Sequence, residues 1–410
     1  MKSIKAFVAR WWVGVILLAA LPIFYIVALG IPFSLDSSFF TFWLAGHMNW
    51  TGEHPYDSAA WVGAHPINGV TWIPNQIFPY PLPLALLMAP LGLFPMAQSF
   101  VIWTVVSQVL IAVSILACAS LWEGRNKQFF ALLIVVAFLL NSNMRILWQT
   151  GSISALFLLF LLIALYLQQK GHDFPAGIAL ALLALKPSFL IIAALIGFWL
   201  LLRRNWKMIG GGITGGLLLF VIGLMQDVNW VSKFRGASEN LFSLRVGSQP
   251  TIVSYTRLAC GGEMNCAIAS YAVIALLLVA LYAWLIWKNR ATLTPLSVFS
   301  AAITLGVLLP PYIWSYDYVL LVIPVCYICF EGIQRTRKFI WPTLFLLLLD
   351  GLSFVMIILF TFNPESSALT IQRDMWSIWV GILVLVTVWW MVFGEKKMQA
   401  SEKVTDMVNG

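Results

Sequence analysis

Uncharged apolar runs constrain the fold of this chain more than any other feature. Runs of about 18 to 25 residues, the length that crosses a bilayer, recur from Trp11 onward. Only 10% of the residues are charged and 61% are hydrophobic, whereas soluble proteins carry about 25% charged residues. The sequence therefore predicts an all-α polytopic membrane protein.

Lysine and arginine gather in short clusters beside these runs, the pattern that orients membrane helices. The clusters fall on one side if both termini are cytoplasmic, which predicts a multi-pass protein of the inner (plasma) membrane. No Lys or Arg occurs between Arg10 and Arg125. Residues 32–95 are therefore expected to form a first outer loop, and residues 227–267 another.

Two apolar stretches do not fit simple spans. Residues 81–95 are short and bounded by proline, so we expect an interfacial or re-entrant segment. Residues 175–202 start and end beside cytoplasmic cations, which predicts a hairpin with Lys186 at its tip. Counting both of its arms gives about twelve membrane segments in one domain, 1–394, followed by a charged cytoplasmic tail, 395–410.

Several classes of function are disfavoured. The formal net charge of +8 reflects membrane orientation, so nucleic-acid binding is not expected. No Gly-rich phosphate loop, nucleophile elbow or HExxH spacing occurs, and we expect neither a metal nor a nucleotide. Cys326 and Cys329 lie inside an apolar run, where we do not expect a CxxC pair to carry out redox chemistry. The spacing of Cys260 and Cys266 in the outer loop leaves a disulfide open.

The first outer loop combines carboxylates with aromatic residues and contains no cation. Carboxylates can act as bases toward sugar hydroxyls, and aromatic rings can stack on sugar faces. The alternative is an amphipathic interfacial helix in which Asp36 or Asp57 serves as an N-cap. Asp317, at a late outer tip, could likewise bind a sugar hydroxyl or cap a helix.

Cations at depth or on the outer side indicate anionic ligands. Lys186 lies within an apolar stretch, where an unpaired ammonium is costly, so it should face a cavity or an anion. Arg245 and Arg257 belong to the few basic residues of the outer loops, and lipid headgroups could satisfy them as well as a substrate phosphate.

Taken in order along the chain, six stretches resemble glycosyltransferase family 87, the polyprenyl-phosphate-mannose-type mannosyltransferases. The stretches are "LDSSFFTFW", "TGEHPYD", "FPYPLPLALLMAPLGLFP", "ALKPSF", "SQPTIVSYTRL" and "PPYIWSYDYVLLVIP". The chain departs from the family at "TGSISAL", where Ser152 and Ser154 replace two amide side chains.

The resemblance implies a GT-C-like membrane bundle and an inverting transfer of hexose at the outer face. The donor would be a polyprenyl-phosphate sugar, with mannose favoured, and the acceptor an envelope glycan or glycolipid, with no further cofactor. Asp36 maps onto the catalytic base of the family. Donor phosphate would be bound by Lys186, Arg257 and Arg245. Sugar or acceptor would be bound by Tyr56, Asp57, Tyr80, Gln249, Tyr316 and Asp317.

Three alternatives stay open on sequence. A transporter or flippase of lipid-linked saccharides would use intramembrane charges, and Asp350 is placed in mid-span. An O-antigen polymerase or ligase is also polytopic, with a large outer loop. A purely structural membrane protein is the third, although it gives no reason for Lys186.

Overall fold

The computed structural model describes residues 38–70, 76–120, 134, 142–236, 249–332 and 367–393. Within these ranges the secondary structure is helical and no strand occurs, which confirms the all-α prediction for the described chain. Three described helices, α5, α11 and α14, are long and apolar enough to cross a membrane. The predicted count of about twelve segments is not confirmed.

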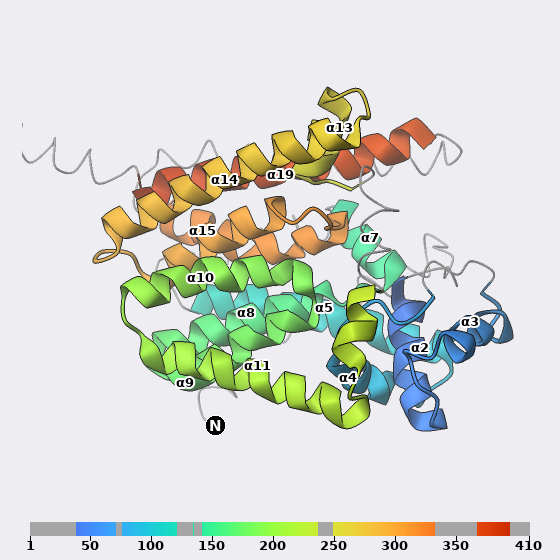
Figure 1. Cartoon of the computed structure of the whole chain (residues 1–410). Helices are drawn as coiled ribbons and strands as arrows, with labels where there is room; N and C mark the ends of the chain where they lie inside the picture. The colour runs from blue at the N-terminus through green and yellow to red at the C-terminus, as the bar shows by residue number, and fades with distance from the viewer. Residues whose placement is uncertain are drawn as a thin grey trace, which may run out of the picture.

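The first half of the described chain contains the helices α2 (Ser38–Thr51), α3 (Ser58–Ile67), α4 (Leu82–Gly92), α5 (Met96–Ser120), α7 (Ser142–Thr150), α8 (Ser154–Gln169), α9 (Asp173–Ala181), α10 (Leu190–Leu202) and α11 (Trp206–Gln226). The second half contains α13 (Ile252–Ala259), α14 (Met264–Asn289), α15 (Pro295–Leu308), α16 (Val322–Tyr327) and α19 (Ser367–Phe393). The short segments are η1 (Leu182–Leu185), η2 (Pro187–Phe189), η3 (Ser315–Leu321) and the π-helical η4 (Ile328–Gly332). Figure 1 shows α2, α3 and α4 gathered at one end of a bundle that includes α8 to α11.

Glycines let α9 and α11 pack backbone against backbone. A Cβ on Gly211 would overlap the carbonyl of Phe174, and a Cβ on Gly215 would lie 2.7 Å from the Cβ of Ala181. These contacts advance in the same direction along both helices, so α9 and α11 run parallel. The chain between them therefore reverses, and Lys186 lies at the turn between η1 and η2.

The bundle has two chemically different ends. At the basic end, Arg203 after α10 donates to the carbonyl of Arg290 after α14, with an Nη1 to O distance of 3.4 Å. At the opposite end, the hydroxyl of Tyr271 near the start of α14 donates to the carbonyl of Leu309 after α15, at 2.6 Å. Tyr271 and Arg290 are 19 residues apart along α14 and its C-cap, so these ends are separated by about 28 Å. We call the end near Tyr271 and Leu309 the loop end.

At the loop end, α2 and α4 pack antiparallel. The Trp50 indole donates to the carbonyl of Ala89 at 2.5 Å, and the Trp43 indole donates to the carbonyl of Phe94 at 3.0 Å. With 11 residues, α4 is shorter than the roughly 20 that a span requires. The ring of Phe42 in α2 also packs against that of Tyr80 before α4, with centroids 5.1 Å apart, so both segments lie at the loop end.

A disulfide joins Cys260 and Cys266, with Cα atoms 5.8 Å apart. It closes the short connection between α13 and α14, and it is the bond that the sequence left open. Cys326 and Cys329 are free thiols and both are buried, as their place in an apolar run predicts.

The α9–α11 contact yields a stability test. Gly211→Ala should destabilise the fold by about 1–3 kcal/mol, because the new methyl group overlaps backbone that cannot move independently. The matched control is Gly210→Ala on the same helix, where nothing lies within 4 Å of the added Cβ. That control should be neutral or stabilising by up to about 1 kcal/mol. Thermal unfolding in detergent measures both, and equal melting temperatures would contradict the close packing.

Candidate functional site

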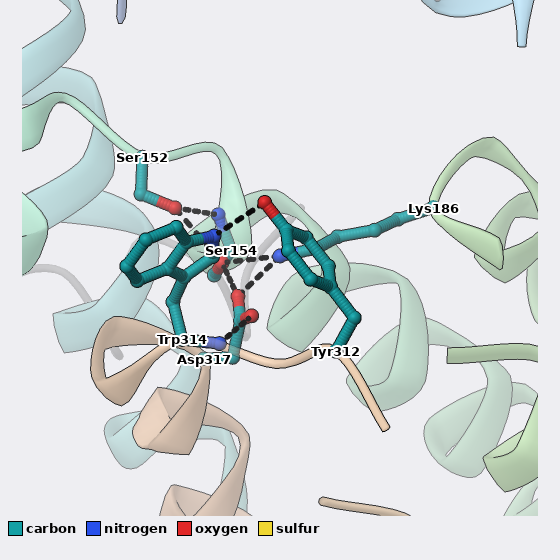
Figure 2. A network of polar contacts seen from close by, with 6 residues as sticks. All are labelled: Ser152, Ser154, Lys186, Tyr312, Trp314 and Asp317. Carbon is teal, nitrogen blue, oxygen red and sulfur yellow. Dashed lines mark hydrogen bonds and ion pairs between the residues drawn. The ribbon is translucent and has the colours of Figure 1, made fainter. Parts of the chain in front are cut away.

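Three segments that are far apart in sequence meet in a buried polar network at the loop end. Ser152 and Ser154 lie at the start of α8, Lys186 at the hairpin turn, and Asp317 in η3. Figure 2 shows these side chains converging on the Asp317 carboxylate. Asp317 and Ser154 are fully buried, and Lys186 is only 5% exposed.

The Asp317 carboxylate is the centre of this network. Its Oδ1 forms an ion pair with the ammonium of Lys186 and accepts a hydrogen bond from the hydroxyl of Ser154. Its Oδ2 accepts from the backbone N–H of Trp314 at 3.0 Å. The Ser154 hydroxyl also lies 3.5 Å from Lys186 Nζ and 2.9 Å from the Ser152 hydroxyl. Both charges are therefore matched and both carboxylate oxygens have donors.

Local sequence explains how the two charged residues are presented. Lys186 precedes a proline and has extended backbone angles, φ −129° and ψ 97°, as steric contact with the proline ring requires. This residue separates η1 from η2 and directs its side chain into the bundle. Asp317 is the third residue of η3 and reaches back to the N–H of Trp314 before the helix, as an acid at that position commonly does.

Aromatic rings surround the cation. Lys186 Nζ lies 4.6 Å from the ring centroid of Phe189 and 5.4 Å from that of Tyr316. Tyr316 stacks on Trp314 with a centroid separation of 6.1 Å. The Trp314 indole donates to the Tyr312 hydroxyl at 3.2 Å. The quadrupoles of such rings favour a cation over their faces, which adds to the stabilisation from Asp317.

Residues from the first predicted outer loop reach the same place. Ser38, the first residue of α2, and Tyr80 both lie close enough to Tyr316 to interact with it electrostatically. The Tyr80 ring packs against Phe42 and Phe78, with centroids 5.1 Å and 5.6 Å away. The structure thus brings Lys186, Asp317, Tyr316 and Tyr80, all predicted as site residues, into one region.

Two other predicted binders are engaged in local structure. The Tyr56 side chain is buried, and its hydroxyl donates to the carbonyl of Tyr80 at 2.5 Å. Burial raises the pKa of Tyr56, so the hydroxyl keeps its proton for this bond. Asp57 is exposed and caps α3 by accepting from the N–H groups of Ala59 and Ala60 at 2.9 Å and 3.2 Å. Asp57 thus has the helix-cap role that the sequence offered as an alternative.

The remaining predicted site residues differ in position. Gln249 is fully buried, and its amide oxygen and nitrogen have no hydrogen-bond partner within the described chain. Arg257 lies in the last turn of α13 and donates from Nε to the carbonyl of Gly262 at 3.4 Å, in the disulfide loop rather than in the network of Figure 2. Asp36, Arg245 and Asp350 lie outside the described residues.

Sequence reasoning missed two members of the network. Ser152 and Ser154 were noted only as departures from a family pattern, although both are buried and bonded to each other. The signal was Gly151, whose φ of +60° makes the sharp turn before α8. A glycine turn followed by Ser152 and Ser154 at the start of a helix places both hydroxyl groups close together. Among the described residues, no group of three His, Cys, Asp or Glu could hold a metal.

The arrangement provides a buried positive charge of the kind that stabilises an anion, next to aromatic faces. In a water-poor site, a fixed cation interacts with developing negative charge far more strongly than in water. The ammonium is matched by Asp317, so an anionic ligand must share or take over that partner.

Comparison with known proteins supports the motif-based resemblance. The pattern of glycosyltransferase family 87 matches residues 78–311, more than half of the chain. The match includes Tyr80, Lys186 and Gln249, whereas Asp36 precedes it and Asp317 follows it. The search of curated proteins found no match to this sequence. With the membrane-type helices and the ordered motifs, this match establishes that the chain belongs to glycosyltransferase family 87.

Proposed function

We propose that this membrane glycosyltransferase moves a hexose, with mannose favoured, from a polyprenyl-phosphate donor to an envelope glycan or glycolipid. The transfer inverts the anomeric centre and takes place at the extracytoplasmic face. The observation that carries the proposal is the buried Lys186–Asp317 pair, whose ammonium lies over the ring of Tyr316, with Ser38 at the start of α2 close to that ring. This arrangement brings the start of α2 near the buried cation.

The position of Ser38 near Tyr316 is relevant to Asp36, the proposed base. Asp36 precedes Ser38 by two residues, and a chain of two residues spans at most about 7 Å. Covalent geometry therefore limits how far Asp36 can lie from the residue that lies near Tyr316. A carboxylate from this part of the chain and the ammonium of Lys186 can flank one substrate.

The chemistry follows from these two groups. Asp36 accepts the proton of the acceptor hydroxyl as its oxygen attacks the anomeric carbon from the face opposite the phosphate. The bond from that carbon to the phosphate oxygen breaks, and its electron pair leaves with the polyprenyl phosphate. Phosphate is a good leaving group, so a cation that stabilises its growing charge is needed more than a strong acid. Lys186 supplies that cation.

Asp317 sets the condition under which Lys186 can bind the donor. A buried ammonium without a partner is costly, and Asp317 provides the partner when no donor is bound. The donor phosphate then joins the pair or replaces the carboxylate on Lys186. Arg245 and Arg257 remain proposed as further phosphate contacts from the outer loop 227–267.

Sugar recognition is assigned to two aromatic rings near the cation and to one buried amide. Tyr80 and Tyr316 offer aromatic surfaces beside the cation. Gln249 brings a buried amide that finds no partner in the described chain. The Tyr56 hydroxyl already donates to the carbonyl of Tyr80, and the Asp57 carboxylate already caps α3. We therefore propose that these two residues support the shape of the sugar site and do not bind the sugar directly.

Asp36→Asn tests the base. The amide keeps the shape but cannot accept the proton, so transfer should fall by about 10²- to 10⁴-fold. The measurement is transfer of labelled hexose from a panel of polyprenyl-phosphate sugars in membranes, at matched protein levels. Asp173→Asn, at the start of α9 and at the basic end, is the matched control and should keep wild-type transfer. Full activity of Asp36→Asn would contradict the assignment.

A double substitution separates phosphate binding by Lys186 from a purely structural pair. Lys186→Met or Asp317→Asn alone should destabilise the fold by about 3–5 kcal/mol, because each leaves a buried charge without its partner. The double variant removes both charges and should unfold near the wild-type temperature. Its transfer should still be about 10²- to 10³-fold lower, because the cation for the phosphate is missing. Restored transfer in the stable double variant would show that the pair is structural only.

A further inference from the structure

A second polar cluster lies at the loop end, outside the Lys186–Asp317 network. Asp227 follows the last residue of α11, and its Oδ2 lies 2.7 Å from Lys233 Nζ. Its Oδ1 accepts from the N–H of Asn229 at 2.8 Å. The same Oδ2 lies 3.8 Å from Nε2 of His54, which belongs to the connection between α2 and α3. Asp227 therefore faces two segments at once.

The hydrogen bonds of His54 define its tautomer. The Nδ1 atom accepts from the N–H of Tyr56 at 3.1 Å, so Nδ1 carries no proton. The proton of the neutral ring is then on Nε2, which is buried without a hydrogen-bond partner in the described chain and faces Asp227. A second proton would have to be placed on Nδ1, against the N–H of Tyr56. Neutral His54 holds this turn, and protonated His54 cannot hold it in the same way.

The turn held by His54 leads to the candidate site. Tyr56 donates through its hydroxyl to the carbonyl of Tyr80 at 2.5 Å. The neighbouring Pro55 carbonyl accepts from the N–H of Phe78 at 3.0 Å, so two bonds tie this turn to the segment before α4. Tyr80 in turn interacts with Tyr316, whose ring lies under the Lys186 ammonium. Hydrogen bonds therefore connect His54 to Tyr56 and Tyr56 to Tyr80, and Tyr80 lies within electrostatic range of Tyr316.

We infer that Asp227, His54 and Tyr56 form a latch that positions the Tyr80–Tyr316 aromatic wall for sugar transfer. This inference rests on the proposed function only for its effect on transfer, since the latch itself is defined by contacts. Asp227 and His54 are positioning residues, because they act on the site through Tyr56 and Tyr80. The latch is closed when His54 is neutral.

The groups around His54 determine the sign of its pH dependence. Burial lowers the pKa of His54, and Lys233 lowers it further. The carboxylates of Asp227 and Asp57 and the backbone of Gln226 raise it, but by less than burial and Lys233 lower it. For Asp227, burial would raise the pKa, but the bonds from Lys233 and the N–H of Asn229 outweigh that effect and lower it. Asp227 therefore stays ionised at neutral pH. Because folding lowers the pKa of His54, its contribution to stability is fully present above the ordinary histidine pKa and is lost as the pH falls from that value through the lowered pKa.

Hydrogen exchange tests the latch without relying on transfer. In the full-length protein in detergent, backbone exchange of segments 52–57 and 76–81 is compared at about pH 7.5 and about pH 5.5, which bracket the ordinary histidine pKa, after correction for intrinsic rates. Wild type should lose protection in both segments at the lower pH. Asp227→Asn should keep protection at the higher pH and lose less of it than wild type at the lower pH, because the carboxylate that raises the pKa of His54 is gone. His54→Asn should keep its protection at both, because the amide oxygen replaces Nδ1 as an acceptor and does not titrate.

His172→Asn at the basic end is the matched control and should follow wild type in exchange and in transfer. Equal protection in Asp227→Asn and wild type at the lower pH, or an acid loss in His54→Asn as large as that in wild type, would overturn the latch. Transfer measured on the same samples should fall by about 10- to 100-fold where protection is lost, as a small displacement of positioning groups can cause. Lost protection with unchanged transfer would overturn the positioning role. If no sample transfers sugar at any pH, the proposed function fails while the exchange result still decides the latch.

Discussion

The ion pair between Lys186 and Asp317 is the interaction on which the candidate site depends. Neither charge could remain buried in this apolar bundle without the other, because an unpaired ion loses its solvation with nothing to replace it. Pairing draws the hairpin turn against η3, and the bonds from Ser154 and Trp314 complete the shell of the carboxylate. The protein thereby stores a fixed positive charge at the loop end of a membrane bundle.

The helix packing explains why the ammonium reaches that depth. Glycines bring α11 close to α9, both helices run the same way, and the chain between them must turn back inside the bundle. The turn falls at Lys186 because the following proline cannot continue the helix. Backbone groups freed at such a turn are tolerated in a membrane protein where they are buried in protein or line a cavity.

Sequence reasoning identified individual residues better than their partners. Lys186 was recognised because a lysine is costly in an apolar run, and the all-α membrane fold followed from the same hydropathy. Its pairing with Asp317, 131 residues away, could not be read from one sequence, because no local spacing encodes it. Ser154 was overlooked because a hydroxyl residue at a helix start has many ordinary roles. Asp57 showed the opposite case, where a carboxylate in a suggestive loop caps a helix.

We propose that Lys186 and the segment around Asp36 flank one lipid-linked donor. A cryo-EM structure of the protein with a bound polyprenyl-phosphate sugar would test this arrangement. We expect a phosphate oxygen about 3 Å from Lys186 Nζ, with the anomeric carbon turned toward the Asp36 carboxylate. A phosphate bound away from Lys186, with the Lys186–Asp317 pair undisturbed and the sugar remote from Asp36, would contradict it.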